Sequence, residues 1–582
     1  MDIFRTKRAY RFIPLGAAAT LLLWAFARFG VTDHSIYRPG PDQIDELYPP
    51  PPPPHHFPPP FGGGRPPPGG PPPHVRPATV WSERADAVKG AFLHAYRGYQ
   101  EYAGSHDELL PVSDAYVDNF NGWRLTLVDS LDTMLIMGLH DEFRETIPIL
   151  ANMTFALPKG KYAPFFETVI RYLGGLLSAY AISGEPILLT RADDLGTMLL
   201  PAFNTTHGLP MYAVNTVSGD TRNGWTGPQI LWAEALSCQM EYKYLAHLTG
   251  RQEYFDRVER IMDLMNEAKV EDNQFATKWS VTTGHPSNDH FSVGAFADSA
   301  HEYLLKQWLL TAKSETKARD LYLRDVEAIL ANLLYVTPNR NLLYVTDTTS
   351  SSPSHTFEHL SCFLPGLLAL GAHTLPLAAR DRERHQWAAQ GLAYTCWITY
   401  ADHETGLGPD EMAMAHTPAD AAHPYPGRWA ELVDAWEAKG RPGRVPPGLA
   451  EAPPRLEGDR DYRATKIDYM LRPETVESFY IMWRTTGDEV WRERGWAVFR
   501  AIEKEAKTKS GYASVASVEK SPARLKDEMP SFFTAETLKY LYLLFHDEEL
   551  IPLDRWVFNT EAHPLPVFEW ADWEKKKYGI LT

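Results

Sequence analysis

The sequence predicts a large all-α body, and three observations support this fold class. From residue 80 onward, apolar residues recur with helical spacing in one segment after another, and turns separate these segments. Runs that alternate between apolar and polar residues, as half-buried strands do, are few. Of the 582 residues, 44% are hydrophobic and 12% aromatic, which is ample material for a core. We therefore expect a body built of many helix pairs.

The N-terminal region differs from this body. Four basic residues among the first eleven precede a stretch without charge at 12–27, and Arg28 follows it. Excess positive charge before an apolar segment favours a cytoplasmic N-terminus. A cleaved signal peptide is the alternative, but the apolar region is long and no A-x-A site follows promptly. We expect a cytoplasmic tail at 1–11, a signal-anchor transmembrane segment at 12–31 and a luminal body.

Two further regions have a loop-like composition. Residues 32–79 are dense in proline and glycine, so they can form extended polyproline but cannot bury a core. We interpret them as a luminal stalk before a catalytic domain at 80–582. Within that domain, the region near 408–461 is rich in Pro, Gly and charge, which indicates a long insertion or loop.

Charge and cysteine content limit the partners and the compartment. The net charge of -17, with no basic patch beyond the N-terminus, argues against nucleic acid as a partner. Three cysteines permit one disulfide in an oxidising lumen, and parity alone does not choose the pair. Asn152 and Asn204 begin N-glycosylation sequons, which are usable only if the body is luminal.

The expected helices follow one another along the body. Residues 165–180, "FFETVIRYLGGLLSAY", place large apolar residues on one stripe. A neighbouring stripe carries Glu167, Arg171, Gly174 and Ser178, where charges meet small residues. Comparable helical patterns occur at 127–139, 230–250, 299–312, 359–372, 474–488 and 534–545.

Acidic residues recur inside these apolar helices. Carboxylates amid large apolar residues are costly to bury unless they are paired or bind a ligand. Several that converge would suit glycoside hydrolysis, in which one acid protonates the leaving oxygen and another carboxylate activates water. Each also has a structural interpretation: Glu167 and Arg171 form a well-oriented i,i+4 pair, and the others could be helix-surface charges. The acids are Asp129, Asp132, Glu167, Glu234, Glu241, Asp298, Glu302, Glu474, Glu477, Glu536 and Glu561.

Six motifs, in this order, resemble a known family: "DSLDTMLIMGL", "FETVIRYLGGLLSAY", "HLSCFLPGLLALGA", "LRPETVESFY", "AETLKYLYLLF" and "FNTEAHP". They are similar to the class I α-1,2-mannosidases of glycoside hydrolase family 47, and the resemblance covers about residues 82–564. It implies an (α/α)7 barrel of inner and outer helices, a calcium ion near the barrel floor, and inverting removal of α-1,2-linked mannose from N-glycans.

The resemblance also implies roles for single residues. Glu474 of "LRPE" matches the base that activates water, and Glu477 supports the floor of the site. Glu167 matches the position proposed as the acid, with Arg171 beside it, and Asp298 matches a third essential carboxylate. How the acid and base roles divide among the three carboxylates stays open. The other matched substrate positions are Arg472, Phe532, Glu536, Glu561 and His359 around the sugar, and Glu234 and Glu241 in the glycan cleft.

Three further expectations rest on the same resemblance. Thr560 of "FNTEAHP" matches the calcium residue, which binds the ion through its hydroxyl and carbonyl oxygens. Cys362 and Cys396 match the disulfide pair, which leaves Cys238 as a buried thiol. At the position of Phe296, enzymes of the endoplasmic reticulum that remove one particular mannose carry Arg, whereas Golgi-type enzymes that trim several branches carry Leu. Phe296 is apolar like Leu, so the resemblance predicts that several branches are trimmed.

One departure concerns "GAFADSAHEYLLK" at 294–306. The family usually has two aromatic residues before Glu302, where this chain has Ala300 and His301. The leading hypothesis remains a membrane-anchored, monomeric, calcium-dependent mannosidase of the endoplasmic reticulum or Golgi that trims high-mannose N-glycans. The alternative is a mannosidase-like lectin of glycoprotein quality control, which binds such glycans and cuts them slowly or not at all. Its binding role would not require the full set of Glu167, Asp298, Glu474 and Thr560.

Overall fold

The structure, a computed structural model, describes residues 79–268, 270 and 273–580. The expected tail, the signal anchor and all but the end of the stalk lie outside these residues. Within the described ranges, no helix is both long and apolar enough to cross a membrane. Every described element belongs to one compact unit.

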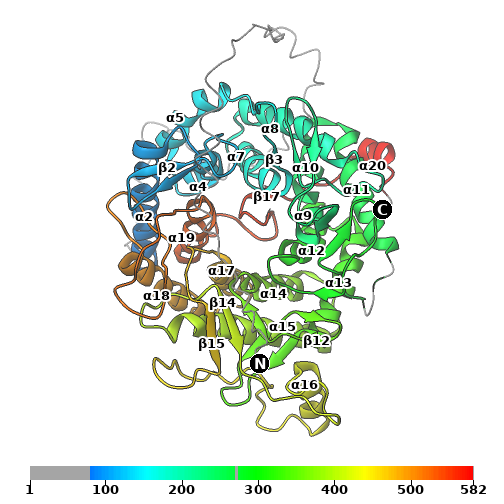
Figure 1. Cartoon of the computed structure of the whole chain (residues 1–582), viewed down its shortest axis with the longest axis vertical. Coiled ribbons are helices and arrows are strands. Elements are labelled where there is room, and N and C mark those ends of the chain that lie inside the picture. The colour runs from blue at the N-terminus through cyan, green and yellow to red at the C-terminus, as the bar shows by residue number, and fades with distance from the viewer. Residues whose placement is uncertain (1–78, 269, 271–272, 581–582) are drawn as a thin grey trace, which may run out of the picture. The chain divides into compact units, whose positions relative to one another are not determined.

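The described body is mostly helical, as the apolar periodicity predicts, and its main helices pack in pairs. The pairs are α4 (Leu131–Ile136) with α5 (His140–Ala151), α7 (Gly174–Ser183) with α8 (Pro186–Leu199), α10 (Gln239–Thr249) with α11 (Gln252–Glu267), α12 (Asp298–Leu310) with α13 (Thr316–Asn332), α14 (Leu364–Thr374) with α15 (Ala379–Ala401), α17 (Glu474–Thr486) with α18 (Val490–Glu505), and α19 (Leu538–Phe545) with α2 (Val80–Ala103). The first helix of each pair lies toward the centre and the second lies outside it (Figure 1).

The position of the inner helices explains why so many polar side chains are buried. Every residue of α12 after Asp298 and every residue of α19 is buried. A helix that is covered on all sides cannot turn a polar stripe to solvent. Its charged residues therefore face either a partner or the centre of the body, and Glu302, Lys306 and Lys539 are examples.

Several expected helices are interrupted. Residues 165–180 form α6 (Phe165–Glu167), a π-helical segment η2 (Thr168–Leu173) and then α7. A second π-helical segment, η6 (Phe533–Thr537), precedes α19. Such segments are rare and frequently occur at functional sites. The remaining helical elements are α3 (Leu125–Asp129), η3 (Leu200–Phe203), α9 (Trp232–Leu236), η5 (His359–Phe363), α16 (Trp429–Ala438) and α20 (Asp572–Tyr578).

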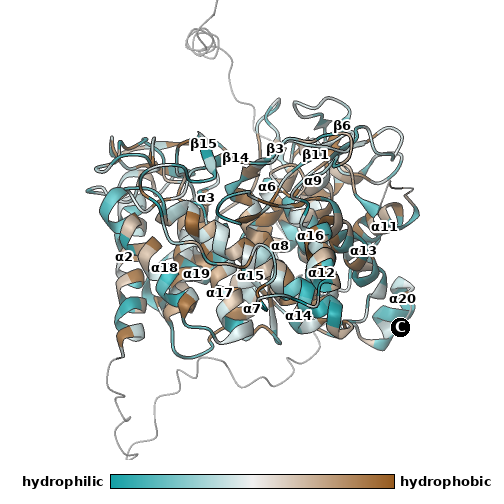
Figure 2. Ribbon diagram, turned by 90° about the horizontal axis from the view of Figure 1, so that it is seen from below, coloured by the Kyte–Doolittle hydropathy of each residue, from teal (hydrophilic) through white to brown (hydrophobic). Residues whose placement is uncertain are grey.

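The all-α expectation was incomplete, because the connections contain short antiparallel strands of two to five residues. Such strands are too short to produce a visible alternating pattern. Several of them gather at one end of the helices (Figure 2). They are β1 (Glu108–Leu110), β2 (Ala115–Val117), β3 (Ala163–Pro164), β4 (Ala213–Val214), β5 (Thr221–Arg222), β6 (Gln229–Leu231), β7 (Lys278–Ser280), β8 (His290–Phe291), β9 (Leu334–Val336), β10 (Leu343–Val345), β11 (Thr348–Thr349), β12 (Ser352–Pro353), β13 (Thr356–Glu358), β14 (Glu411–Met414), β15 (Tyr462–Lys466), β16 (Trp556–Phe558) and β17 (Pro564–Pro566).

Two of these regions bear on the expectations from sequence. The region near 408–461 is more than a loop, since it contains β14 and α16. The hairpin β16–β17 pairs Phe558 with Pro564, so residues 559–563 form its turn. This hairpin contacts the inner helices α7 and α12, and β17 lies near the centre of the body (Figure 1).

Candidate active site

The hairpin turn 559–563 is fixed by the side chain of Asn559. Its Nδ2 donates hydrogen bonds to the backbone oxygen of Ile170, at 3.0 Å, and to Glu241 Oε1, at 2.7 Å. Its Oδ1 accepts from the backbone N–H groups of Glu561 and His563, at 2.9 and 2.8 Å. One buried amide therefore holds Thr560 and Glu561 in place against the helix that contains Ile170.

A glycine lets this turn approach helix α7. A Cβ on Gly174 would lie 2.6 Å from Asn559 Nδ2 and 3.0 Å from His563 Cδ2. Both distances are shorter than ordinary van der Waals contact, so a side chain here would push the turn away. The small residue that the sequence places beside Glu167 and Arg171 thus has a packing reason.

His563 anchors the end of the turn between two buried aspartates. Its Nδ1 lies 2.8 Å from Asp132 Oδ2 and its Nε2 lies 3.1 Å from Asp129 Oδ1. Burial lowers the pKa of His563, but the two carboxylates more than offset this, so its pKa is raised. Lys539 Nζ lies 3.0 Å from the other oxygen of Asp132. The cost of burying these charges is therefore offset by pairing.

Arg171, in the π-helical segment η2, connects Glu167 to the hairpin turn. Its Nε donates to Glu167 Oε2 at 2.8 Å, and its Nη1 contacts Glu561. Asp129 lies 3.7 Å from the same Nη1, and the guanidinium carbon lies 5.8 Å from the ring centroid of Phe532. The i,i+4 pair visible in the sequence is thus one part of a buried network.

Glu474 begins helix α17 and faces the 3₁₀ segment η5. Its Oε2 lies 2.9 Å from His359 Nδ1. Arg472, two residues earlier, donates from Nε to Asp410 at 2.7 Å. The Asp298 carboxyl lies at the start of α12, and burial, reinforced by neighbouring carboxylates that include Glu474, raises its pKa to about 7. Asp298 and Glu474 are therefore electrostatic neighbours, although 176 positions separate them in the chain.

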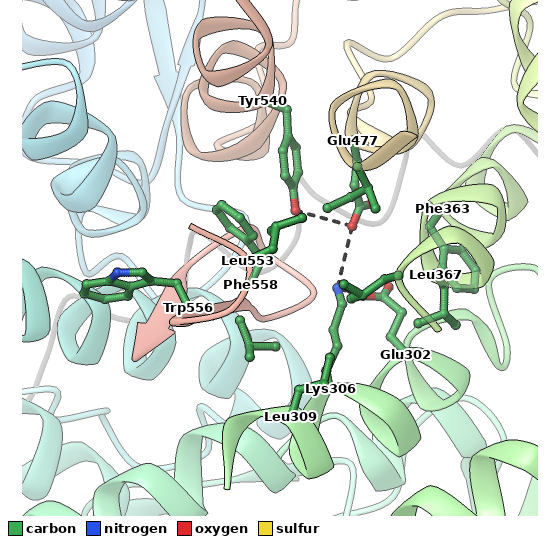
Figure 3. Close-up of a pocket in the computed structure, with 14 residues that line it drawn as sticks. Glu302, Lys306, Leu309, Phe363, Leu367, Glu477, Tyr540, Leu553, Trp556 and Phe558 are labelled. Carbon is green, nitrogen blue, oxygen red and sulfur yellow. Dashed lines mark hydrogen bonds and ion pairs between the residues drawn. The ribbon is translucent and has the colours of Figure 1, made fainter. Parts of the chain in front are cut away.

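Glu302, Lys306 and Glu477 form a charged cluster on the wall of an adjacent pocket (Figure 3). Lys306 contacts Glu302 and lies 3.6 Å from Glu477 Oε1, which also accepts from the Tyr540 hydroxyl at 3.3 Å. Thr560 Oγ1 donates to Glu302 Oε1 at 3.2 Å. Burial raises the pKa of Glu477 to about 8, which Lys306 only partly counteracts.

Glu536, in η6, completes the group. Its pKa is raised well above the ordinary value by burial and by the nearby charges of Glu561, Glu474 and Glu477. Glu536 thus lies close enough to three carboxylates on two other elements to be repelled by them. The structure therefore brings together the acids that the sequence scatters over α17, η6 and the hairpin turn.

Comparison with known proteins identifies the origin of this arrangement. The sequence profile described as Glycosyl hydrolase family 47 matches residues 91–567, which is well over half of the chain. The chain belongs to glycosyl hydrolase family 47. This confirms the resemblance that the six motifs indicate, and family 47 is a family of glycoside hydrolases.

Individual family 47 proteins are similar to this chain over most of its length. The chain is 35% identical over 492 residues to mannosyl-oligosaccharide alpha-1,2-mannosidase IA of Drosophila melanogaster, covering 83% of this chain and 67% of the relative. It is 38% identical over 497 residues to the endoplasmic reticulum mannosyl-oligosaccharide 1,2-alpha-mannosidase of Rattus norvegicus, covering 84% and 68%. The solved alpha-1,2-mannosidase from Trichoderma reesei has a TM-score of 0.71 at 27% identity, covering 83% of this chain and 99% of that one.

The calcium ion expected for a family 47 enzyme can be tested against the residues present. Across 79–268, 270 and 273–580, no group of three or more His, Cys, Asp or Glu side chains is arranged to hold a metal. The chemistry of the surroundings still fits calcium, because Thr560 offers two hard oxygen donors beside an excess of carboxylates. Burial is the main cause of the raised pKa values of Glu477, Glu536 and Glu561, and neighbouring carboxylates raise them further, so a cation here would neutralise excess negative charge.

The two acids expected in the glycan cleft occupy different places. Glu234 is half-buried, and after burial itself the charge of Glu167 is a further cause that raises its pKa, to about 7. Glu241 is fully buried and accepts hydrogen bonds from Tyr303 and Asn559. Glu241 therefore supports the hairpin turn, and its place in the glycan cleft stays a prediction.

Phe296 is half-buried and lies beside an exposed aromatic residue that periodicity could not identify. Its ring lies 5.8 Å from that of Trp225, whose side chain is largely solvent-exposed at 67%. Lys278 lies over both rings, at 5.3 and 5.8 Å from their centroids. Trp225 comes from the loop after β5, and a lone tryptophan between glycine and threonine carries no pattern that would reveal its partner.

The structure also shows where the cysteines and the two glycosylation sequons lie. Cys362 and Cys396 form a disulfide with a Cα–Cα distance of 6.0 Å, and Cys238 is a free, buried cysteine. Asn152 and Asn204 are exposed, at the ends of α5 and η3. Their positions leave room for a glycan on each side chain.

Proposed function

We propose that this protein is a calcium-dependent, inverting exo-α-1,2-mannosidase that removes terminal mannose from high-mannose N-glycans. The observation that carries the proposal is the buried network in which Arg171 joins Glu167 to Glu561, next to the carboxylates of Glu474, Glu477 and Glu536. The names of the fly, rat and fungal relatives support α-1,2-linked mannose as the substrate.

The proposed roles follow from proton chemistry. Glu474, oriented by His359, accepts a proton from the attacking water. A general acid must hold a proton near neutral pH, and the pKa of Asp298, raised to about 7 by burial, suits that task. Glu167 and Arg171 then fix the sugar beside these groups. A calcium ion held by Thr560 would supply a positive charge that orients oxygen ligands.

The remaining expectations are proposed on the same basis. The inner and outer helix pairs support an (α/α)7 barrel, and the β16–β17 hairpin contacts its inner helices α7 and α12. The apolar Phe296 supports trimming of several branches. We further propose a monomer that is anchored as a single-pass type II protein in the endoplasmic reticulum or Golgi membrane through residues 12–31, with glycans on Asn152 and Asn204.

The decisive experiment is incubation of the purified protein with a nine-mannose N-glycan, with and without a calcium chelator. We expect release of mannose, first as the β-anomer because the α-linkage is inverted, and NMR can detect this anomer. The release should stop when calcium is removed. Tight glycan binding with no release at any calcium concentration would instead establish the lectin function.

A further inference from the structure

His301, where the family usually has an aromatic residue, makes two buried hydrogen bonds. It lies one turn after Asp298 in α12, and its side chain is only 4% exposed. Its Nδ1 lies 2.5 Å from Asp325 Oδ2 on α13, and its Nε2 lies 3.0 Å from the backbone oxygen of Ser292. The ring meets Trp232 of α9 edge-on, with 4.8 Å between the centroids.

These contacts define the charge of His301. A backbone carbonyl and a carboxylate can only accept hydrogen bonds, so both ring nitrogens must donate. With Asp325 ionised, these contacts suit an imidazolium that donates to both partners. The charged groups that face it agree: burial lowers its pKa, but Asp325 from α13 and Asp298 from its own helix outweigh burial and raise it.

The backbone oxygen that His301 holds begins the loop 292–297, which leads directly to Asp298. Gly294, in this loop, accepts hydrogen bonds from the N–H groups of Ala297 and Asp298, both at 2.9 Å. The carbonyl of Phe296 accepts from the N–H of Ala233 at 3.2 Å. The loop therefore carries Phe296 at its tip and a proposed catalytic carboxyl at its end, and His301 ties its first residue to α12 and α13.

We propose that His301 and Asp325 form a positioning pair, which fixes the loop 292–297 and thereby the placement of Phe296 and Asp298 toward the glycan. The inference rests on the proposed function for its substrate, and on the contacts above for its geometry. A phenylalanine at position 301 could make neither hydrogen bond, and a tyrosine has a single donor. The two ring nitrogens of His301 are therefore what ties the loop to α13.

The test compares His301→Gln and Asp325→Asn with a matched control, His247→Gln. His247 also pairs with a buried carboxylate, Glu574 at 3.1 Å, but it links α10 to α20, away from the loop. Hydrogen exchange of loop amides 293–297 and hydrolysis of nine-mannose glycan are measured on each protein. Asp325→Asn preserves side-chain shape, so it remains informative if His301→Gln does not fold.

We expect faster exchange in the loop, a loss in kcat/KM of about 10 to 100-fold, and a changed order of products for both variants, because small misplacements near reacting groups are costly. His247→Gln should keep wild-type exchange in the loop and the wild-type order of products. The proposal is overturned if the loop amides exchange at the wild-type rate in both variants. It is also overturned if His247→Gln accelerates exchange of these amides as much as the two variants do. A wild type that cleaves no glycan would refute the proposed function, while the exchange comparison would still decide the positioning role.

Discussion

Glu474 and His359 are joined by a 2.9 Å contact between Oε2 and Nδ1, and the other ring nitrogen of His359 lies 2.5 Å from the hydroxyl of Tyr400. His359 and Tyr400 are both buried. A carboxylate held by such a chain of contacts has one fixed orientation, which is what a base needs if it is to meet a water molecule in a defined place.

The first prediction concerns this carboxylate. Glu474→Gln should reduce kcat by about 100 to 10,000-fold while the glycan remains bound, because an amide keeps the shape of the side chain but cannot accept the proton of water. Turnover measurements check the loss of kcat, and calorimetry checks that glycan affinity is retained. A variant with the wild-type rate would exclude Glu474 as the base.

The sequence was sufficient for the helical body and for several acids of the site, for reasons that particular residues make clear. Glu167 and Arg171 stand i,i+4, and Glu474 and Glu477 stand i,i+3, so local spacing already reveals these pairs. Ordered motifs then indicated the family. Nothing local shows that Arg171 reaches Glu561, which is 390 positions away, because that contact depends on where the hairpin enters the ring of helices.

The π-helical segments and the contacts between distant parts of the chain could not be predicted from apolar periodicity. The π-helical segments η2 and η6 shift the register of Arg171 and Glu536 by less than a turn, which an apolar stripe cannot resolve. Nothing local shows that Glu241 bonds to Asn559, which is 318 positions away. His563 and Lys539 escaped notice because their partners, Asp129 and Asp132, belong to a distant part of the chain.

The second prediction tests the calcium residue. Thr560→Val keeps the volume of the side chain but removes the hydroxyl donor, so the protein should retain less calcium and its melting temperature should depend less on added calcium. Thr374→Val is a matched control, because that hydroxyl bonds only within α14, to Leu370. Metal content after dialysis decides: equal calcium in both variants and the wild type would contradict the assignment.

The third prediction concerns pH without calcium. The pKa of Glu477 rises from 4.5 to about 8 and that of Asp298 from 3.8 to about 7, in both cases mainly through burial. Between these limits the folded protein binds more protons than the unfolded chain, so the free energy of unfolding should fall as pH rises from 5 to 8.

Melting temperatures across this range in chelator measure that slope. Calcium should reduce it, because a cation stabilises the charged carboxylates in place of protons. Glu477→Gln should also reduce it, since one of the titrating groups is removed. A slope in chelator that Glu477→Gln leaves unchanged would show that Glu477 does not carry a raised pKa.

The fourth prediction uses two helical glycines. Gly174→Ala should destabilise the protein by about 1 to 3 kcal/mol, because the new methyl group would meet Asn559 and His563. Gly90→Ala, in α2, meets nothing within 4 Å and should stabilise by about 0.4 to 1 kcal/mol. Chemical denaturation of both variants checks the opposite signs. Equal effects would mean that the hairpin turn is not packed tightly against α7.

The last prediction concerns which mannose residues are removed. Phe296 and Trp225 present apolar ring surface beside the start of α12, and such surface makes few directional demands on a sugar. The wild type should therefore trim nine-mannose glycan progressively toward the five-mannose form. Phe296→Arg should restrict the set of products, because a guanidinium offers up to five hydrogen-bond donors that can fix one branch of the glycan.

Leu432→Arg is the control, since it adds the same charge on α16, in the region near 408–461. A time course of the glycans released by all three proteins gives the answer: a wild type that halts after one specific mannose would refute relaxed specificity, and equal narrowing in the control would assign the effect to charge alone.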